Sequence, residues 1–144
     1  MGPAPILRRM NFHKGLAPTT PLVCAHRMRT ILVVIVYTHE FVREAERLWS
    51  DEELAEFTDF IARNPESGSI IPGMEGVRKI RWSRAGTGKR GGVRVIYYYY
   101  NDRIPIFLFD VYAKSAKEDL EAAAKKSILR VIDVIKARMK EQKQ

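Results

Sequence analysis

Three strand patterns follow one another between residues 77 and 112, and they constrain the fold more than any other feature of the chain. They span Val77 to Trp82, Val93 to Tyr100 and Ile104 to Tyr112, and each is rich in β-branched and aromatic residues. The gap from Asn101 to Arg103 is short enough for a hairpin turn. Because strands joined by short connections usually pair side by side, this region predicts an antiparallel sheet.

Two helical segments separate these strands from a fourth strand pattern. Ile31 to Tyr37 is a short, bounded β-branched run that predicts a buried strand. Thr38 is a suitable N-cap for the first helix, and Ser50 to Glu53 matches the capping box that begins a second helix. The second helix should end near Asn64, because Pro65 disfavours the helical conformation of the residue before it.

The last helix is predicted to begin at a second capping box, Ser115 to Glu118. Apolar residues recur at helical spacing after it, from Leu120 to Met139. The predicted element order is therefore β-α-α-β-β-β-α. We expect an α+β fold in which an N-terminal helical hairpin packs on a four-stranded antiparallel or mixed sheet, closed by the C-terminal helix.

Residues 1–27 differ in composition from the rest of the chain. They hold four basic residues, no acid and four of the seven prolines, and they show no periodicity. This predicts a disordered basic leader over residues 1–27, followed by one domain over residues 28–144. A transit peptide should also be amphipathic and Ser-rich, and a secretory signal needs a continuous apolar stretch. We favour a third explanation, an over-long start assignment with Met28 as the first residue.

The composition narrows the function classes. With 25 Lys and Arg against 17 Asp and Glu, the net charge of +8 indicates a polyanionic partner such as nucleic acid. The longest apolar run, Ile31 to Tyr37, is too short to span a membrane. A single cysteine excludes a disulfide framework and suits a reducing cytosol, and the three histidines lack metal-ligand spacing. We therefore expect a cytoplasmic protein without metal or cofactor.

Positive charge is concentrated between residues 78 and 94, where seven Lys or Arg occur without an acid. Four glycines in the same stretch would let backbone amides approach a phosphate closely. Strand alternation places Lys79 and Arg81 on one face and Arg78 on the other. This pattern favours a phosphodiester-binding surface over a set of solvated charges. The basic residues of that surface are Arg78, Lys79, Arg81, Arg84, Lys89, Arg90, Arg94 and Lys114.

Two other patterns in this region are weaker evidence of function. Gly86 to Gly91 fits G-x-G-x-x-G, but it leads into a strand, whereas the dinucleotide-binding fingerprint must open a helix. The run Tyr97 to Tyr100 should place two rings in the core and two outside it. An exposed pair could stack on bases, and packing under the helices is an equally good interpretation.

Five short motifs are arranged along the predicted domain. They are Asn64-Pro65-Glu66-x-Gly68, Ile71-x-Gly73, Val77-Arg78-Lys79-Ile80-Arg81, Gly86-x-Gly88-Lys89-Arg90-Gly91-Gly92-x-Arg94-Val95-Ile96-Tyr97-Tyr98 and Val111-Tyr112-x-Lys114. Together they resemble the HigB branch of the RelE-like toxins, in the RelE/ParE superfamily, over about Met28 to Arg138. The resemblance implies a type II toxin–antitoxin system whose toxin is a ribosome-dependent messenger-RNA endonuclease. It also implies a cognate helix-turn-helix antitoxin, through which alone the pair contacts operator DNA.

The reaction that the resemblance implies uses no metal. A ribose 2′-hydroxyl attacks the adjacent phosphate and leaves a 2′,3′-cyclic phosphate and a free 5′-hydroxyl, which requires a base, a cation and an acid. By the resemblance, Lys79 and Arg81 are the basic pair of the second strand, and Lys79 is the candidate base. Arg94 would clamp the scissile phosphate with its planar guanidinium, and Lys114 would assist the leaving group.

The remaining predicted site residues are peripheral. Lys89 and Arg90 would hold flanking phosphates or ribosomal RNA, as would Arg78 and Arg84, and such contacts carry no base specificity. Some relatives have a tyrosine early in the last helix that stacks on the messenger base, and here Tyr112 is its candidate replacement, with a plain core position as the alternative.

The alternative function is a non-catalytic nucleic-acid- or ribosome-binding protein on the same scaffold, a degenerate toxin.

Overall fold

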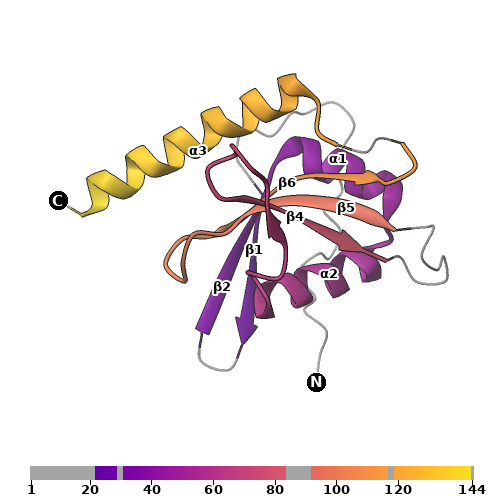
Figure 1. Ribbon diagram of the computed structural model, residues 1–144. Helices are drawn as coiled ribbons and strands as arrows, with labels where there is room; N and C mark the ends of the chain where they lie inside the picture. Colours follow the sequence, from indigo (N-terminus) through magenta and orange to yellow (C-terminus); the bar gives the residue numbers. More distant parts are fainter. Residues whose placement is uncertain (1–21, 29–30, 84–91, 117–118, 144) are drawn as a thin grey trace, which may run out of the picture.

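The computed structural model describes residues 22–28, 31–83, 92–116 and 119–143, and they form an α+β fold around one mixed sheet (Figure 1). The elements are β1 (Leu22–Met28), β2 (Ile31–Tyr37), α1 (His39–Leu48), α2 (Asp51–Arg63), β3 (Ser69–Ile70), β4 (Val77–Trp82), β5 (Val93–Tyr98), β6 (Ile106–Ala113) and α3 (Ala122–Gln142). The strand order is β1-β2-β6-β5-β4-β3. Only β2 and β6 pair in parallel among these strands. The α+β class is confirmed, and the elements predicted from Ile31 onward occur in the predicted order, with the short strand β3 in addition.

The sheet has six strands where four were predicted. β1 pairs antiparallel with β2 along its whole length, so the last residues of the segment expected to be a disordered leader form a strand. β3 is a two-residue strand that pairs with Arg78 and Lys79, and it lies between the second predicted helix and the strand predicted from Val77, where no strand was expected. Both extra strands add to the edges of the sheet, where unpaired backbone groups are available. Residues 1–21 lie outside the described residues, and the domain boundary at residue 28 stays a prediction.

Both N-terminal helices begin at the predicted caps. The Thr38 hydroxyl accepts a hydrogen bond from the Phe41 backbone N–H at 3.2 Å and donates one to the Phe109 carbonyl at 2.8 Å. Thr38 therefore starts α1 and also ties the end of β2 to β6. At α2, the Ser50 hydroxyl accepts from the Glu53 N–H at 3.2 Å, and the Glu53 carboxylate accepts from the Ser50 N–H at 2.8 Å. This reciprocal capping box satisfies two backbone N–H groups at the start of α2.

The sheet carries a hydrophobic core on each face. One core, which we call the hairpin core, joins α1 and α2 to one face through residues such as Phe41 and Phe57. The other, which we call the α3 core, joins α3 to the opposite face through Ile128 and Ile132. The helices α2 and α3 therefore lie on opposite sides of the sheet (Figure 1). Tyr97 belongs to the hairpin core and Tyr98 to the α3 core, and both are buried. Two of the four rings are thus in the core, as expected, but they are consecutive: because both faces of the sheet are covered, Tyr97 and Tyr98 are both buried, whereas Tyr99 is half-buried and Tyr100 is exposed.

A continuous series of aromatic rings crosses the hairpin core from β2 to β4. Ring centroids are 5.5 Å apart for Tyr37 and Phe41, and 6.3 Å apart for Phe41 and Trp49. Phe57 of α2 then lies 5.2 Å from Trp49 and 5.4 Å from Trp82, the last residue of β4. These rings fix both helices beneath the end of β4, which is the end that carries Arg81.

The start of α3 differs from the prediction. The helix begins at Ala122 after Glu121, which makes no side-chain capping bond, so the capping box expected at Ser115 to Glu118 does not open it. Leu120 instead lies buried in the α3 core before the helix begins. Burial of this side chain in the α3 core accompanies the later start of the helix, and tertiary packing overrides the local helix signal.

The loop after α2 is attached to the sheet by one buried tyrosine. The Tyr97 hydroxyl donates to the Pro65 carbonyl at 2.8 Å and accepts from the Gly68 N–H at 2.8 Å. A Cβ atom at Gly68 would lie 2.7 Å from that hydroxyl oxygen and 3.0 Å from the Lys79 carbonyl. Only glycine therefore fits there, which explains this part of the Asn64-Pro65-Glu66-x-Gly68 motif by packing.

Replacing Tyr97 with phenylalanine should lower the free energy of unfolding by about 1–3 kcal/mol, because a buried N–H and a carbonyl both lose their partner. Urea denaturation would measure the loss. Tyr100→Phe is the matched control, since that side chain is 52% exposed. Equal stabilities of the two variants would contradict a structural role for the Tyr97 hydroxyl.

Candidate functional site

Three neighbouring strands bring four of the predicted site residues together. Arg81 of β4 lies opposite Arg94 of β5, and Arg94 lies opposite Tyr112 of β6. Cross-strand partners share one face of a sheet, so these side chains form a row across three strands. Lys79 lies two residues before Arg81 on the same face, as strand alternation predicted. We call these four residues the basic row.

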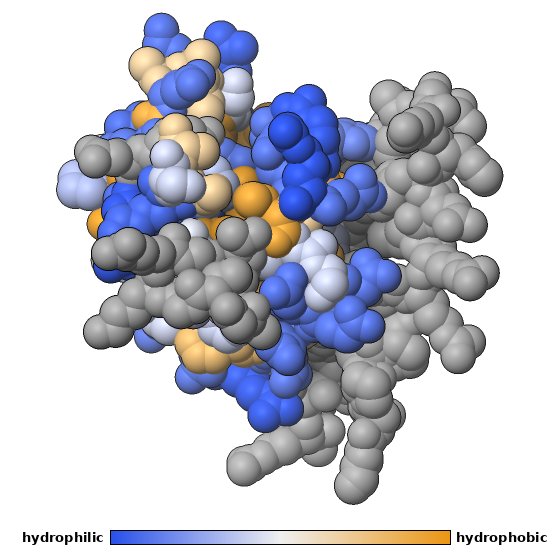
Figure 2. All heavy atoms as spheres, turned by 90° about the vertical axis from the view of Figure 1, so that its right-hand side faces the viewer, coloured by the Kyte–Doolittle hydropathy of each residue, from blue (hydrophilic) through white to orange (hydrophobic). Residues whose placement is uncertain are grey.

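The basic row lies on the face of the sheet that α3 partly covers, at the end where β4 stops and β5 begins. Figure 2 views this end of the molecule, and hydrophilic side chains cover most of the coloured surface there. Lys79 and Arg94 are half-buried, and Arg81 is exposed. The three cationic side chains therefore project from strands of the sheet, and each remains accessible to solvent.

Tyr112 is the buried member of the row, with 4% of its surface exposed, and its ring packs in the α3 core. Burial raises the pKa of the Tyr112 phenol above its usual value, the Arg94 guanidinium opposes that shift, and the charges of Asp119 and Asp110 reinforce it. The side chain is therefore a neutral phenol beside Arg94 near neutral pH. The packing of this ring agrees with the core alternative for Tyr112, and its stacking role stays a prediction.

Two acids of this face were missed by the sequence analysis. Asp110 is buried on β6, two residues before Tyr112. A lone acid inside an otherwise apolar strand is the signal that could have identified it. Asp119 follows the strand in the connection to α3, and one of its carboxylate oxygens lies 4.0 Å from the Lys79 ammonium. Its place beside β4 depends on the path of that connection, which no local pattern predicts.

Asp119 also contacts the start of α3. The other carboxylate oxygen lies 3.8 Å from the ammonium of Lys125, another residue that the sequence analysis did not select. The Leu120 backbone N–H donates to Asp119 at 2.9 Å. This hydrogen bond is the main reason that the pKa of the Asp119 carboxyl lies below its usual value; burial opposes the shift, and the charges of Lys125, Lys79 and Arg94 reinforce it. Asp119 is therefore an anion surrounded by cations from β4, β5 and α3.

The other predicted residues are placed differently. Arg78 faces the hairpin core side, and its guanidinium donates to the Glu66 carbonyl at 3.1 Å and to the Gly68 carbonyl at 2.8 Å. The structure thus separates Arg78 from the basic row and uses it to hold the loop after α2. Lys114 is exposed directly after β6, and its backbone N–H lies 3.4 Å from the Gly92 carbonyl. Arg84, Lys89 and Arg90 lie outside the described residues.

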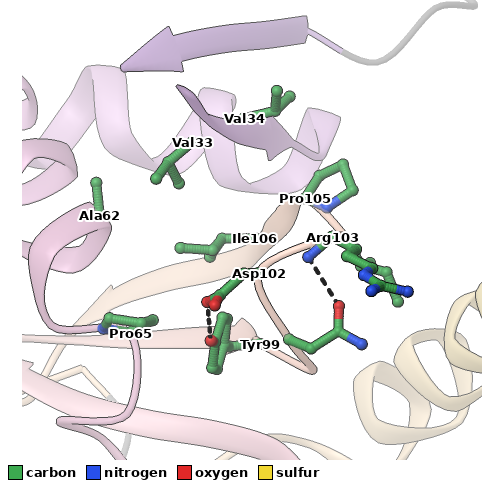
Figure 3. A pocket seen from close by; sticks show the side chains of 11 residues that line it. Val33, Val34, Ala62, Pro65, Tyr99, Asp102, Arg103, Pro105 and Ile106 are labelled. Atoms are coloured by element: carbon green, nitrogen blue, oxygen red, sulfur yellow. Dashed lines mark hydrogen bonds between the residues drawn. The ribbon is translucent and has the colours of Figure 1, made fainter. Parts of the chain in front are cut away.

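A pocket of about 120 Å³ lies at the opposite end of the sheet, between β2, the end of α2 and the β5–β6 hairpin (Figure 3). The Tyr99 hydroxyl donates to the Asp102 carboxylate at 2.8 Å inside it. Burial, then this hydrogen bond and the negative charge of Asp102, raise the pKa of Tyr99 to about 12. None of the predicted site residues that the structure describes lines this pocket. Within the described ranges, no three His, Cys, Asp or Glu side chains gather in a way that could hold a metal ion.

No helix in the described part of the chain combines the length and apolar composition that a membrane span requires.

No known family model matches the chain. Among solved structures, it is similar to that of a double arginine-to-alanine variant of the Escherichia coli toxin RelE in the free state. The two sequences are 22% identical, and the match covers 57% of this chain and 83% of the RelE chain with a TM-score of 0.42.

Proposed function

We propose that this chain is the toxin of a type II toxin–antitoxin system and cleaves messenger RNA on the ribosome. The observation that carries the proposal is the basic row, in which Lys79, Arg81 and Arg94 share one open face of the sheet. The motifs that resemble HigB and RelE-like toxins support it, because those three positions are the ones that the resemblance assigns to phosphate chemistry. The net charge of +8 suits an RNA partner.

The proposed reaction assigns a separate step to each cation. The ribose 2′ oxygen attacks the adjacent phosphorus, a new bond forms to the 2′ oxygen, and the bond from phosphorus to the 5′ oxygen breaks. Lys79 in its neutral form takes the 2′-hydroxyl proton, and Lys114 gives a proton to the leaving 5′ oxygen. The negative charge that develops on the phosphate oxygens is stabilised by Arg94, assisted by Arg81. Tyr112 acts as a positioning residue that packs beside Arg94.

The proposal extends to the partners and the compartment. A toxin of this kind works on ribosomes in the cytoplasm and is neutralised by a cognate antitoxin. We propose a small helix-turn-helix antitoxin, which would also make the only contact with operator DNA. A short reading frame for such a protein beside the gene for this chain would support this part of the proposal, and its absence would weaken it.

Mapping the 5′ ends of cellular messages after induced expression tests the proposed function. We expect growth arrest and new 5′-hydroxyl ends in frame with codons for the unchanged protein, and neither for the Lys79→Ala/Arg94→Ala double variant. The control is Arg43→Ala/Arg47→Ala, which removes the same two charges from exposed positions on α1, where surface ion pairs contribute little. New ends with every variant would remove the basic row from the active site.

A non-catalytic binding protein is the second candidate, and one contact favours it. The Asp119 carboxylate lies 4.0 Å from Lys79, so RNA would have to displace Asp119 before Lys79 could act as a base. If the folded, well-expressed protein binds ribosomes and generates no new 5′ ends, this second function replaces the first.

A further inference from the structure

The Asp119 carboxylate lies among cations as a bound anion would lie in an anion-binding site. The Asp119 carboxylate forms ion pairs with two lysines through different oxygens. One oxygen lies 4.0 Å from the ammonium of Lys79 on β4, and the other lies 3.8 Å from the ammonium of Lys125 on α3. Arg94 of β5 adds a third positive charge to its surroundings. Two elements, β4 and α3, thus place an ammonium group within 4.0 Å of one carboxylate, and the neighbouring strand β5 carries Arg94 on the same face of the sheet.

The backbone at Asp119 is fixed, whereas its carboxylate is exposed and can be displaced by another anion. Leu120 is buried in the α3 core, so the backbone beside Asp119 is fixed and α3 starts close by. The Asp119 side chain itself is 57% exposed, and that of Lys79 is 30% exposed. Ion pairs this open to solvent are weak, so a phosphate that enters from solvent can take the place of the carboxylate. Carboxylate and phosphate oxygens accept the same charge-assisted hydrogen bonds from lysine and arginine.

We propose that Lys125 joins Lys79 and Arg94 in a binding site for a phosphate group of RNA, and that Asp119 occupies this site until RNA displaces it. The proposal rests on the function proposed above and extends it in two ways. It adds Lys125, a residue of α3, to the RNA-binding surface, and it makes Asp119 an internal competitor of the substrate.

The test measures two ligands with one set of variants. Inorganic phosphate is titrated against the full chain and followed by phosphorus NMR, and a labelled oligouridine is titrated and followed by fluorescence anisotropy. Asp119→Asn should tighten the binding of both by about threefold to tenfold, because the competing charge is gone. Asparagine retains the oxygen that accepts from the Leu120 N–H, so the fold should be kept. Glu56→Gln is the control, since it removes one exposed charge from α2 on the other face of the sheet.

Lys125 provides the second arm of the test. Lys125→Ala should weaken RNA binding and cancel the gain of Asp119→Asn when the two changes are combined. It should also lower the slope of log affinity against log salt by about 0.7, the value for one lost phosphate contact on a single strand. Lys126→Ala is the matched control, because Lys126 is the next residue of the same helix and is exposed. Lys126→Ala should leave phosphate binding unchanged.

The outcomes separate this inference from the proposed function. If Asp119→Asn and Glu56→Gln change phosphate binding equally, or if Lys125→Ala has no effect, the phosphate site is overturned, whatever the protein does to messages. If Asp119→Asn tightens phosphate binding in a Lys125-dependent manner while no variant cleaves RNA on ribosomes, the site stands and the nuclease function fails.

Discussion

Replacing Arg94 with alanine should lower the rate of ribosome-dependent cleavage by about 10²–10³-fold and leave the fold intact. In the proposed reaction Arg94 stabilises charge that develops at the phosphate, and loss of one such donor has an effect of this size in other enzymes. Arg94 is half-buried at the centre of the basic row, between Arg81 and Tyr112, so no neighbour can easily replace it. Single-turnover cleavage of a programmed ribosome would measure the rate.

Two further variants make the result on Arg94 specific. Arg94→Lys keeps the charge but loses the planar fork, and we expect an intermediate rate. Tyr112→Phe removes the phenol beside Arg94 and should have a smaller effect, because Tyr112 only positions the guanidinium. Circular dichroism and the urea midpoint should match those of the unchanged protein. If Arg94→Ala cleaves at the normal rate, Arg94 is not part of the catalytic machinery.

Replacing Phe57 with alanine should have the largest effect on stability, about 3–5 kcal/mol less free energy of unfolding. The Phe57 side chain is fully buried, and its ring links Trp49 to Trp82 within the hairpin core. Its removal leaves a cavity between α2 and the end of β4 that neighbouring rings, held on rigid elements, can fill only in part. The loss would be measured by urea denaturation, with the slope of the transition checked for a change in the unfolded state.

The exposed neighbour Glu56 supplies the control for Phe57. Glu56→Ala should change the free energy of unfolding by less than about 0.5 kcal/mol, as surface substitutions commonly do. The results expected for Arg94 and Phe57 also check each other, because Arg94→Ala should be stable and inactive, whereas Phe57→Ala should be active in proportion to the folded fraction. A Phe57→Ala protein as stable as the Glu56→Ala protein would contradict the packing described for the aromatic series.

Local sequence signals predicted those elements whose ends are set by local chemistry. Thr38 and Ser50 begin helices because their hydroxyls cap nearby N–H groups, and α2 ends at Arg63, just before Asn64 and Pro65. β4 has the predicted bounds, Val77 to Trp82. The short strand β3 has no pattern of its own and exists through its pairing with β4, so only the folded sheet defines it.

The candidate site was predictable in its residue types and only partly in its geometry. Alternation alone separated Arg78 from Lys79 and Arg81, and the structure has them so. The position of Arg94 opposite Arg81 depends on strand register, which no single strand encodes. The contact of Asp119 with Lys79 depends on a connection whose local signal indicated a helix, and burial of Leu120 overrode that signal.

The thin packing of α3 gives the molecule two levels of cooperativity. Only Ile128 and Ile132 are buried among the 21 residues of this helix, whereas α1 and α2 share a core with most of the sheet. Most of the stability of a helix in a protein comes from the packing of its apolar face, so we expect α3 to persist mainly through those contacts. Sub-global opening of α3 therefore costs far less free energy than unfolding of the sheet. Each opening carries Lys125 away from Lys79, and the charge balance of the basic row changes while the rest of the protein stays folded.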